Sequence, residues 1–408
     1  MSLNKYLVYS TLFGIFSEAL LLRVGFDLKF IYLIVMVNSG LLVFVNKFLL
    51  NKELSLAVLV YFILGIFSVF FFQNKIDRVY FQIFGIFLMG SYFYTFFRYV
   101  NISYIDIFKK YCVCSYYLSL IGILFFLVFI ITGIDISFEL TKLPFYGYPD
   151  SSESLRLRSI FLEPAHFAGI SLPALYYYLV HFKRRKRNFL VIFIALILTF
   201  STIAYVGIAL AIIISLRNQS TILKKIVIAS FIGVSMYYAY VKINDFSLRI
   251  GDTYALFFLG GKEDTPINLS TYTLYSNFFV TFNVLRDSPF IGHGIGSHPI
   301  SYNNYIGNIP LLQMSELNKE DANSLTLRIL SELGIVGLLM VLFFIKKNYV
   351  NHNYISQAIL LYFWYKLFRE GHYFSPEMYF FVFLYFAIKR DNILKILRNY
   401  ENSSIRLS

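Results

Sequence analysis

The sequence predicts an all-α polytopic integral membrane protein with about twelve transmembrane helices. Of its 408 residues, 58% are hydrophobic and only 14% are charged. Apolar runs of roughly 17–22 residues recur along the chain, close to the ~20 residues with which a helix crosses a bilayer. No polar region is large enough to fold separately, so we expect residues 1–408 to form a single membrane domain.

The expected helices follow these apolar runs in chain order. The segment 188–216 leaves two interpretations open. It forms either two short spans or one long helix, and one long helix would reverse the membrane orientation of every later span. We predict spans near 5–22, 28–46, 54–72, 79–97, 110–132, 165–182, 188–200, 203–216, 225–241, 326–345, 352–368 and 375–388.

The distribution of basic residues sets the orientation. With twelve spans and a cytoplasmic N-terminus, the cytoplasmic segments hold 21 of the 36 Lys and Arg residues but only four of the 23 Asp and Glu residues. Lys and Arg are enriched in cytoplasmic loops, so the net charge of +13 indicates topology, and we expect no nucleic-acid partner. Both termini are predicted to be cytoplasmic, and two larger loops, about 133–164 and 242–325, to be periplasmic.

The first large loop ends in a polar cluster that leads into the apolar run 165–182. Charge is costly beside a bilayer, so dense polarity at a membrane boundary marks a candidate site. The cluster offers two guanidinium groups, a hydroxyl, a carboxylate and an imidazole, from Arg156, Arg158, Ser159, Glu163 and His166. The alternative is a polar loop whose arginines contact lipid headgroups and whose glutamate only caps the next helix.

Pro164 is expected in the first turn of that helix, where its missing N–H costs nothing. Glu163 then lies at the positive end of the helix dipole. The dipole and nearby guanidinium groups lower a carboxyl pKa, whereas lipid and apolar neighbours raise it. A carboxylate in such a balance is a candidate general base.

The second large loop combines a predicted surface helix near 269–286 with a turn-rich segment from Asp287 to His298. Glycines in that segment let the backbone approach a ligand closely. They do not form a dinucleotide-binding motif, because no strand precedes them. His298 is a candidate acid or base in this loop, ahead of His293.

No motif in the sequence indicates a metal or another cofactor. It contains neither an Asp-x-Asp nor a His-Glu-x-x-His motif. Cys112 and Cys114 face different directions on one predicted helix. We therefore expect no catalytic metal and no disulfide.

These residues resemble motifs of the O-antigen ligase/polymerase superfamily, most closely those of a Wzy-type polysaccharide polymerase. The pattern Arg-x-x-Ser-x-Phe-x-Glu-Pro-x-x-x-Ala, from Arg156 to Ala168, is similar to the arginine-bearing loop of the polymerases. The Pro-x-x-Gly-x-Gly run that begins at Pro289 resembles part of their second loop. The ligases have a His, then Asn, Ser or Gln, nine residues, Gly, two residues and Gly. That spacing is intact up to Gly337, but Asn323 replaces the His.

The resemblance implies a glycosyltransferase at the periplasmic face of the bacterial inner membrane. It would join undecaprenyl-diphosphate-linked repeat units into O-antigen, capsule or exopolysaccharide. An acceptor hydroxyl would attack the donor's anomeric carbon, and undecaprenyl diphosphate would leave. The expected partners are the lipid-linked donor and acceptor glycans and the lipid bilayer, with a chain-length regulator and a flippase as further candidates.

The chemistry of this reaction suggests a role for each candidate residue. Arginine offers phosphate oxygens a permanent fork of donors, so Arg156 and Arg158 are expected to stabilise the leaving diphosphate, with Arg286 as partner ahead of Arg249. Glu163 is the expected general base. The predicted catalytic residues are Glu163, Arg156, Arg158 and His298, and the predicted substrate-binding residues are Arg286, Asn323, His166 and Ser159.

Two other functions remain open. A ligase would transfer the finished glycan to lipid A core or to protein, and Asn323 in place of His argues against it. A transporter or flippase usually has paired halves with polar groups at mid-membrane. Here we find no internal repeat, and most polar residues fall in the external loops.

Overall fold

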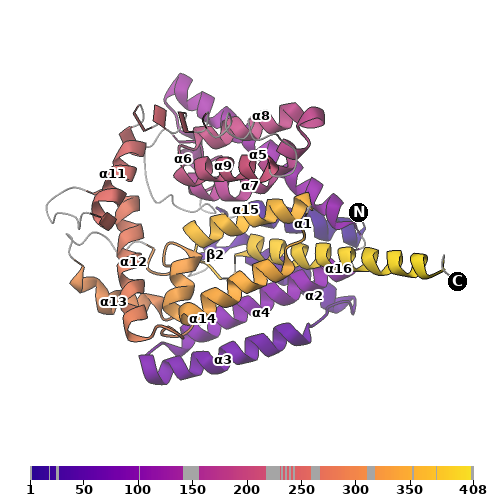
Figure 1. The fold of residues 1–408 in the computed structure, drawn as a ribbon, viewed down its shortest axis with the longest axis horizontal. Coiled ribbons are helices and arrows are strands. Elements are labelled where there is room, and N and C mark those ends of the chain that lie inside the picture. Colours follow the sequence, from indigo (N-terminus) through magenta and orange to yellow (C-terminus); the bar gives the residue numbers. More distant parts are fainter. Residues whose placement is uncertain are drawn as a thin grey trace.

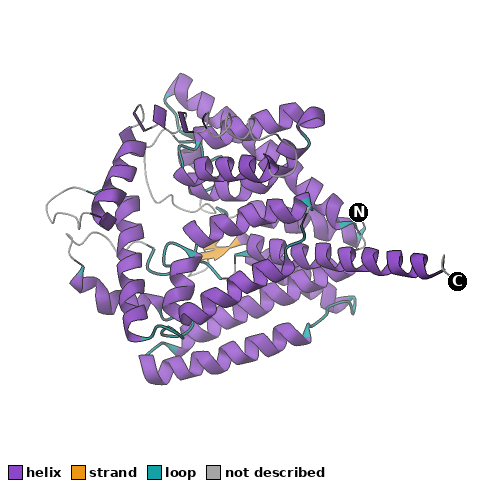
Figure 2. Ribbon diagram, viewed as in Figure 1, coloured by secondary structure: helices purple, strands orange, loops and turns teal. Residues whose placement is uncertain are grey.

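Helices make up nearly all of the structure, as Figure 2 shows. In this computed structural model most of the long helices lie along one direction, and α12 (Leu269–Asp287) runs across their ends (Figure 1). The N-terminus and the C-terminal end of α16 lie at the opposite end of the bundle. The structure describes residues 2–17, 19–23, 27–100, 102–140, 156–216, parts of 230–241, then 244–258, 267–309, 318–351, 353–373 and 375–405.

Four of the described helices are long and apolar enough to cross a membrane: α3 (Lys52–Phe72), α4 (Ile76–Tyr99), α5 (Tyr104–Thr132) and α14 (Leu325–Asn348). Helix α3 has 21 residues, a length of about 32 Å that matches the ~30 Å hydrocarbon core. Most of its apolar side chains are exposed and its only buried residues are Gly65 and Ser68, as lipid contact requires. A helical membrane protein is confirmed, whereas about twelve spans stays a prediction because the other apolar helices are shorter.

The first predicted span, 5–22, is wrong in its last third. Helix α1 (Leu3–Phe16) ends early, and an antiparallel hairpin of β1 (Leu21–Arg23) and β2 (Asp27–Lys29) follows before α2 (Phe30–Phe44). The strands pair their own backbone polar groups, which an isolated extended segment could not do. The fold is therefore not purely α-helical.

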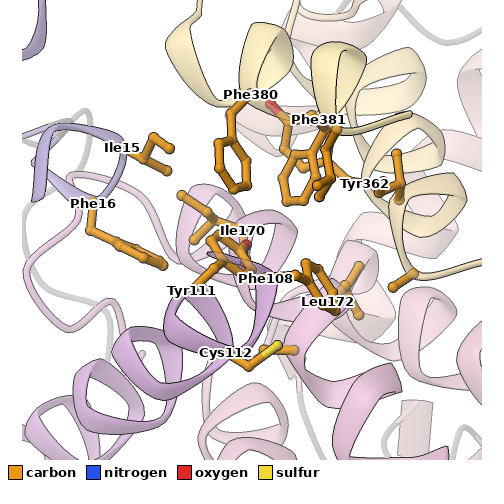
Figure 3. Packing of buried hydrophobic residues seen from close by; sticks show 14 of the residues in the cluster. Ile15, Phe16, Phe108, Tyr111, Cys112, Ile170, Leu172, Tyr362, Phe380 and Phe381 are labelled. Carbon is orange, nitrogen blue, oxygen red and sulfur yellow. The ribbon is translucent and has the colours of Figure 1, made fainter. Parts of the chain in front are cut away.

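Helix α7 (Pro164–Val180) lies at the centre of the apolar core. Thirteen of its 17 residues are buried. They pack against α5, α8 (Phe182–Leu198), α9 (Thr202–Leu216) and α15 (Tyr354–Arg369). A Cβ at Gly169 would lie 2.3 Å from the ring of Tyr365, so this glycine lets α15 approach closely. Figure 3 shows Tyr111 of α5 facing Phe380 and Phe381 of α16, and its hydroxyl donates to the Ile170 carbonyl of α7. The N-terminal end of α7 is thus held firmly in place.

The structure settles the choice at 188–216 in favour of two helices, α8 (Phe182–Leu198) and α9 (Thr202–Leu216). Phe200 between them has φ +45°, a left-handed conformation that no α-helix continues through. The predicted span 225–241 lies largely outside the described residues, as does the side chain of Arg249.

The remaining helices complete the two ends of the bundle. Helix α15 matches its predicted span, while α16 continues well past the predicted end at 388. A helix is present at the position predicted near 269–286, as α12. The helices that complete the described fold are α15 (Tyr354–Arg369), α16 (Pro376–Ile405), α6 (Ile136–Glu139), α11 (Asn244–Phe258), α13 (His298–Tyr305) and η2 (Ile306–Asn308).

Candidate functional site

Three segments that are far apart in the sequence meet at the end of the bundle crossed by α12. They are the start of α7, the turn before α14 and the end of α15. The guanidinium of Arg369 joins them, because Nη2 lies 2.9 Å from Glu163 Oε2 and Nη1 lies 2.7 Å from Asn323 Oδ1. Their side chains are only partly exposed, at 20% for Arg369 and 15% for Glu163. The three residues form a polar centre in which the arginine and the carboxylate are partly exposed.

Glu163 is the N-cap residue of α7, with Pro164 in the first turn, as the sequence predicts. Its carboxylate makes no capping hydrogen bond and turns instead toward Arg369. His166 follows one turn later, with Nε2 4.0 Å from the same Glu163 oxygen. The start of α7 therefore presents an acid and an imidazole side by side.

Asn323 lies in a tight turn whose backbone requires a residue tolerant of positive φ. Its φ is +60° and that of Ala322 is +56°, and Asn is among the residues that tolerate this conformation best. Its backbone N–H donates to Asp321 Oδ1 at 3.2 Å, and its Oδ1 also accepts from Asn318 Nδ2 at 3.1 Å. Asn323 is 2% exposed, so its amide is fixed in place before any substrate binds.

The segment after α15 packs closely against this turn. A Cβ at Gly371 would lie 1.7 Å from the Asp321 carbonyl oxygen, which leaves room only for glycine. Arg328 Nη1 of α14 donates to the Gly371 carbonyl at 3.1 Å. His372 Nε2 lies 3.8 Å from Asp321 Oδ2 and adds a second acid–imidazole pair near the first.

Buried charges brace the end of α15. Lys366 Nζ lies 2.6 Å from Glu370 Oε1 and 3.5 Å from Glu377 Oε1. Burial acts to raise the pKa of Glu370, but Lys366 and nearby histidines outweigh it, so the pKa is lowered and the carboxylate stays charged. Burial raises the pKa of Asp321 instead. The pKa values of Glu370 and Asp321 are thus shifted in opposite directions.

Residues 167–342 match the family model described as O-antigen ligase. The match spans less than half of the chain and supports its resemblance to the O-antigen ligase/polymerase superfamily. A search of curated proteins finds no match. The matched region covers the segment from Asn323 to Gly337, whereas Glu163 and Arg369 lie outside it on either side.

Two motifs of the superfamily resemblance form one structural unit. Gly334 has φ +65° and interrupts α14, and a Cβ there would lie 2.3 Å from the Phe290 backbone. The loop that begins at Pro289 docks at this kink, since Ile335 N donates to the Pro289 carbonyl at 3.0 Å and Gly294 N to the Glu332 carbonyl at 2.8 Å. Gly334 therefore lets the loop that begins at Pro289 dock closely against α14.

His298 joins the same unit from α13 and is fully buried. Its Nδ1 lies 2.8 Å from Ser331 Oγ and its Nε2 lies 2.9 Å from Asn277 Oδ1. Burial, with a smaller effect of Arg328, lowers the pKa of His298 to about 3. The ring is neutral and both nitrogens are engaged, so this geometry favours a brace between α12 and α14 over the predicted base.

The arginines of the first cluster are held by other protein groups. Arg156 Nε donates to the Thr199 carbonyl at 3.1 Å, and Arg158 Nη2 lies 3.1 Å from Asp135 Oδ2. Ser159 has φ +55°, and its hydroxyl donates to the Leu118 carbonyl at 2.8 Å. These contacts fix the loop on α5, α6 and the break after α8.

Arg286 is exposed on the last turn of α12. Within the described ranges, no hydrogen bond or ion pair joins it to Glu163, Asn323 or Arg369. Arg369 is not among the site residues predicted from the sequence, although the sequence contains an indication of it. Arg369, Glu370 and His372 interrupt two apolar runs, the same mark of charge at a membrane boundary that identified the first cluster.

Proposed function

We propose that this protein is a polysaccharide polymerase that joins undecaprenyl-diphosphate-linked oligosaccharide repeat units. The observation that carries the proposal is the centre of Glu163, Arg369 and Asn323, with Asn323 at the position where the ligases have His. An amide there binds a sugar or orients a neighbour, but it does not take up a proton. The proton acceptor is then a different residue.

Glu163 is the proposed general base. Its pairing with Arg369 keeps the carboxylate charged and oriented. The hydroxyl of the acceptor sugar gives its proton to Glu163 as its oxygen forms a bond to the anomeric carbon of the donor. The bond from that carbon to the phosphate oxygen breaks, and undecaprenyl diphosphate leaves with the electron pair. His166 lies near enough to orient the same carboxylate.

The departing diphosphate needs fixed positive charge. Arg156 and Arg158 remain the proposed contacts, and each would exchange a present partner, the Thr199 carbonyl or Asp135, for phosphate oxygens. Such an exchange would couple substrate binding to a movement of the loop. Arg369 is a third candidate, because it already lies at the polar centre.

We place this reaction at the periplasmic face of the bacterial inner membrane, with both termini cytoplasmic and residues 1–408 as one membrane domain. The Lys and Arg residues concentrated in the predicted cytoplasmic segments support this orientation, since such residues are retained on the cytoplasmic side. A chain-length regulator and a flippase are the proposed protein partners.

The ligase is the alternative function, favoured by the description of the matched family model. The two are separated by deleting the gene in its host and resolving the surface glycan on a gel, with the wild-type gene restored as control. A polymerase deletion leaves a single repeat unit and no ladder. A ligase deletion leaves polymer on the lipid carrier and none on its final acceptor, and that result would overturn the proposal.

A further inference from the structure

A groove lies between the start of α3, the end of α4 and the middle of α16. Its volume of 560 Å³ falls in the ~300–1,000 Å³ range of pockets that hold small molecules. The loop before α3 forms one wall and is fixed to α4, because Thr95 Oγ1 donates to the Leu49 carbonyl and accepts from the Leu49 N–H, each at 3.0 Å.

The rim of the groove is basic. Lys52, Arg98, Lys389 and Arg390 line it, with Glu53 as the acidic lining residue. Arg98 belongs to the last turn of α4, and its guanidinium lies 5.5 Å from the centre of the Tyr94 ring. Cations near a helix C-terminus or over an aromatic ring are stabilised there.

Lys389, one of these basic residues, also connects α14 to the groove. Lys389 Nζ donates to the Lys347 carbonyl at 3.0 Å and to Asn348 Oδ1 at 3.3 Å. Those acceptors lie at the end of α14, so several helix ends converge on the groove. Its positive charge is therefore built into the bundle and does not depend on a flexible tail.

Apolar side chains also line the groove, both before and after Lys389 and Arg390 along α16. Phe386, Ile393 and Leu394 are 42%, 46% and 45% exposed, and Phe97 and Phe383 complete the surface. Exposure of such side chains to water is unfavourable, and contact with hydrocarbon relieves it. The groove thus combines a cationic rim with a hydrocarbon-seeking wall.

The groove and the candidate site lie at opposite ends of the same helices. Helix α4 has 24 residues, so its two ends are about 36 Å apart, close to the thickness of a bilayer core. Helix α16 packs against α4 and extends from the candidate site past the groove (Figure 1). The basic rim therefore lies at the level of phospholipid headgroups on the face away from the site.

We propose that this groove binds an anionic diacyl phospholipid, with its phosphate on the basic rim and its acyl chains along the apolar wall. Basic pockets between membrane helices are suited to such headgroups. A soluble anion would use the rim alone and leave the exposed side chains of Phe386, Ile393 and Leu394 uncovered. A zwitterionic lipid would carry no net charge for the rim to attract.

The test uses the full-length protein purified in mild detergent. Phosphatidylglycerol, phosphatidylcholine and inorganic phosphate are added separately, and bound lipid is counted by native mass spectrometry while the melting temperature is recorded. We expect phosphatidylglycerol alone to bind and to raise the melting temperature. An equal effect of phosphate would reduce the groove to an anion site, and an equal effect of phosphatidylcholine would remove its charge selectivity. Either result would overturn the proposal.

The matched variants remove three charges in two places. Arg98→Gln/Lys389→Gln/Arg390→Gln should bind phosphatidylglycerol at least about tenfold more weakly, because each basic residue contributes to headgroup attraction. Lys183→Gln/Arg184→Gln/Arg187→Gln, in the exposed basic run of α8, should bind as the parent does. If the first triple variant does not fold, Arg390→Gln alone, at an exposed position, should still weaken binding. Unchanged binding in the groove variants would refute the site.

Discussion

Glu163 and Arg369 are 206 positions apart in the sequence, yet Glu163 Oε2 lies 2.9 Å from Arg369 Nη2. The same guanidinium holds Asn323, and through it the turn that begins α14. One arginine therefore sets the relative positions of a proposed base and of the residue that replaces the ligase histidine. Removing any of the three should disturb the other two.

Glu163→Gln tests the general base. The amide keeps the shape of the side chain but cannot accept a proton, so turnover should fall about 100-fold or more. Polymer length is measured with purified protein and lipid-linked repeat units. Asp106→Asn is the control, because Asp106 is 54% exposed and pairs with Lys109 at the start of α5. Near-normal chain extension by Glu163→Gln would end the assignment.

Arg369→Lys tests the bridge. A single ammonium keeps the charge but lacks the planar fork that reaches both Glu163 and Asn323, so activity should fall about tenfold or more. Arg184→Lys, in the exposed basic run of α8, should leave activity unchanged. The protein level in the membrane is measured in parallel. Full activity of Arg369→Lys would show that charge alone is enough and that the bridge has no role in orientation.

Asn323→His tests the boundary between polymerase and ligase. An imidazole at this position restores the ligase pattern, but the surrounding acceptor site is unchanged, so ligase activity should not appear. The measurement is transfer of polymer to lipid A core in a strain that lacks its own ligase. Transfer by the variant, but not by the parent, would show that this one residue decides the reaction.

The buried His298 predicts a pH dependence of stability. Its pKa of about 3 in the fold lies below the ordinary value near 6.5, so unfolding takes up a proton at mildly acidic pH. This contribution to stability is complete above pH ~6.5 and is lost as the pH falls toward 3. The melting temperature of the parent should therefore drop more steeply between pH 7 and 5 than that of His298→Asn. Parallel curves would show that this histidine is not the titrating group.

The orientation predicts how single cysteines react. In a background without Cys112 and Cys114, Glu320→Cys should react with a membrane-impermeant thiol reagent added outside intact inner membranes, and Arg185→Cys should not. Both side chains are exposed, so access depends on the side of the membrane. Permeabilised cells, in which both should react, are the control. The reverse pattern would overturn the proposed topology.

Several features of the protein follow from short stretches of its sequence. The apolar runs predicted a helical membrane protein, because only hydrocarbon-facing helices need such composition. Pro164 predicted the start of α7 and the position of Glu163, because proline is tolerated in a first helical turn. The spacing from Asn323 to Gly337, with the Arg156–Ala168 and Pro289 motifs, led to the superfamily that the family match supports.

Only the tertiary structure decided which of these residues act together. Arg369 joined Glu163 to Asn323 because α7, α14 and α15 pack with their ends adjacent, and a linear pattern does not record that packing. His298 is buried between α12 and α14 because its ring contacts Asn277 of α12 and Ser331 of α14. Contacts between distant helices depend on the summed fit of many apolar side chains, which no short motif contains.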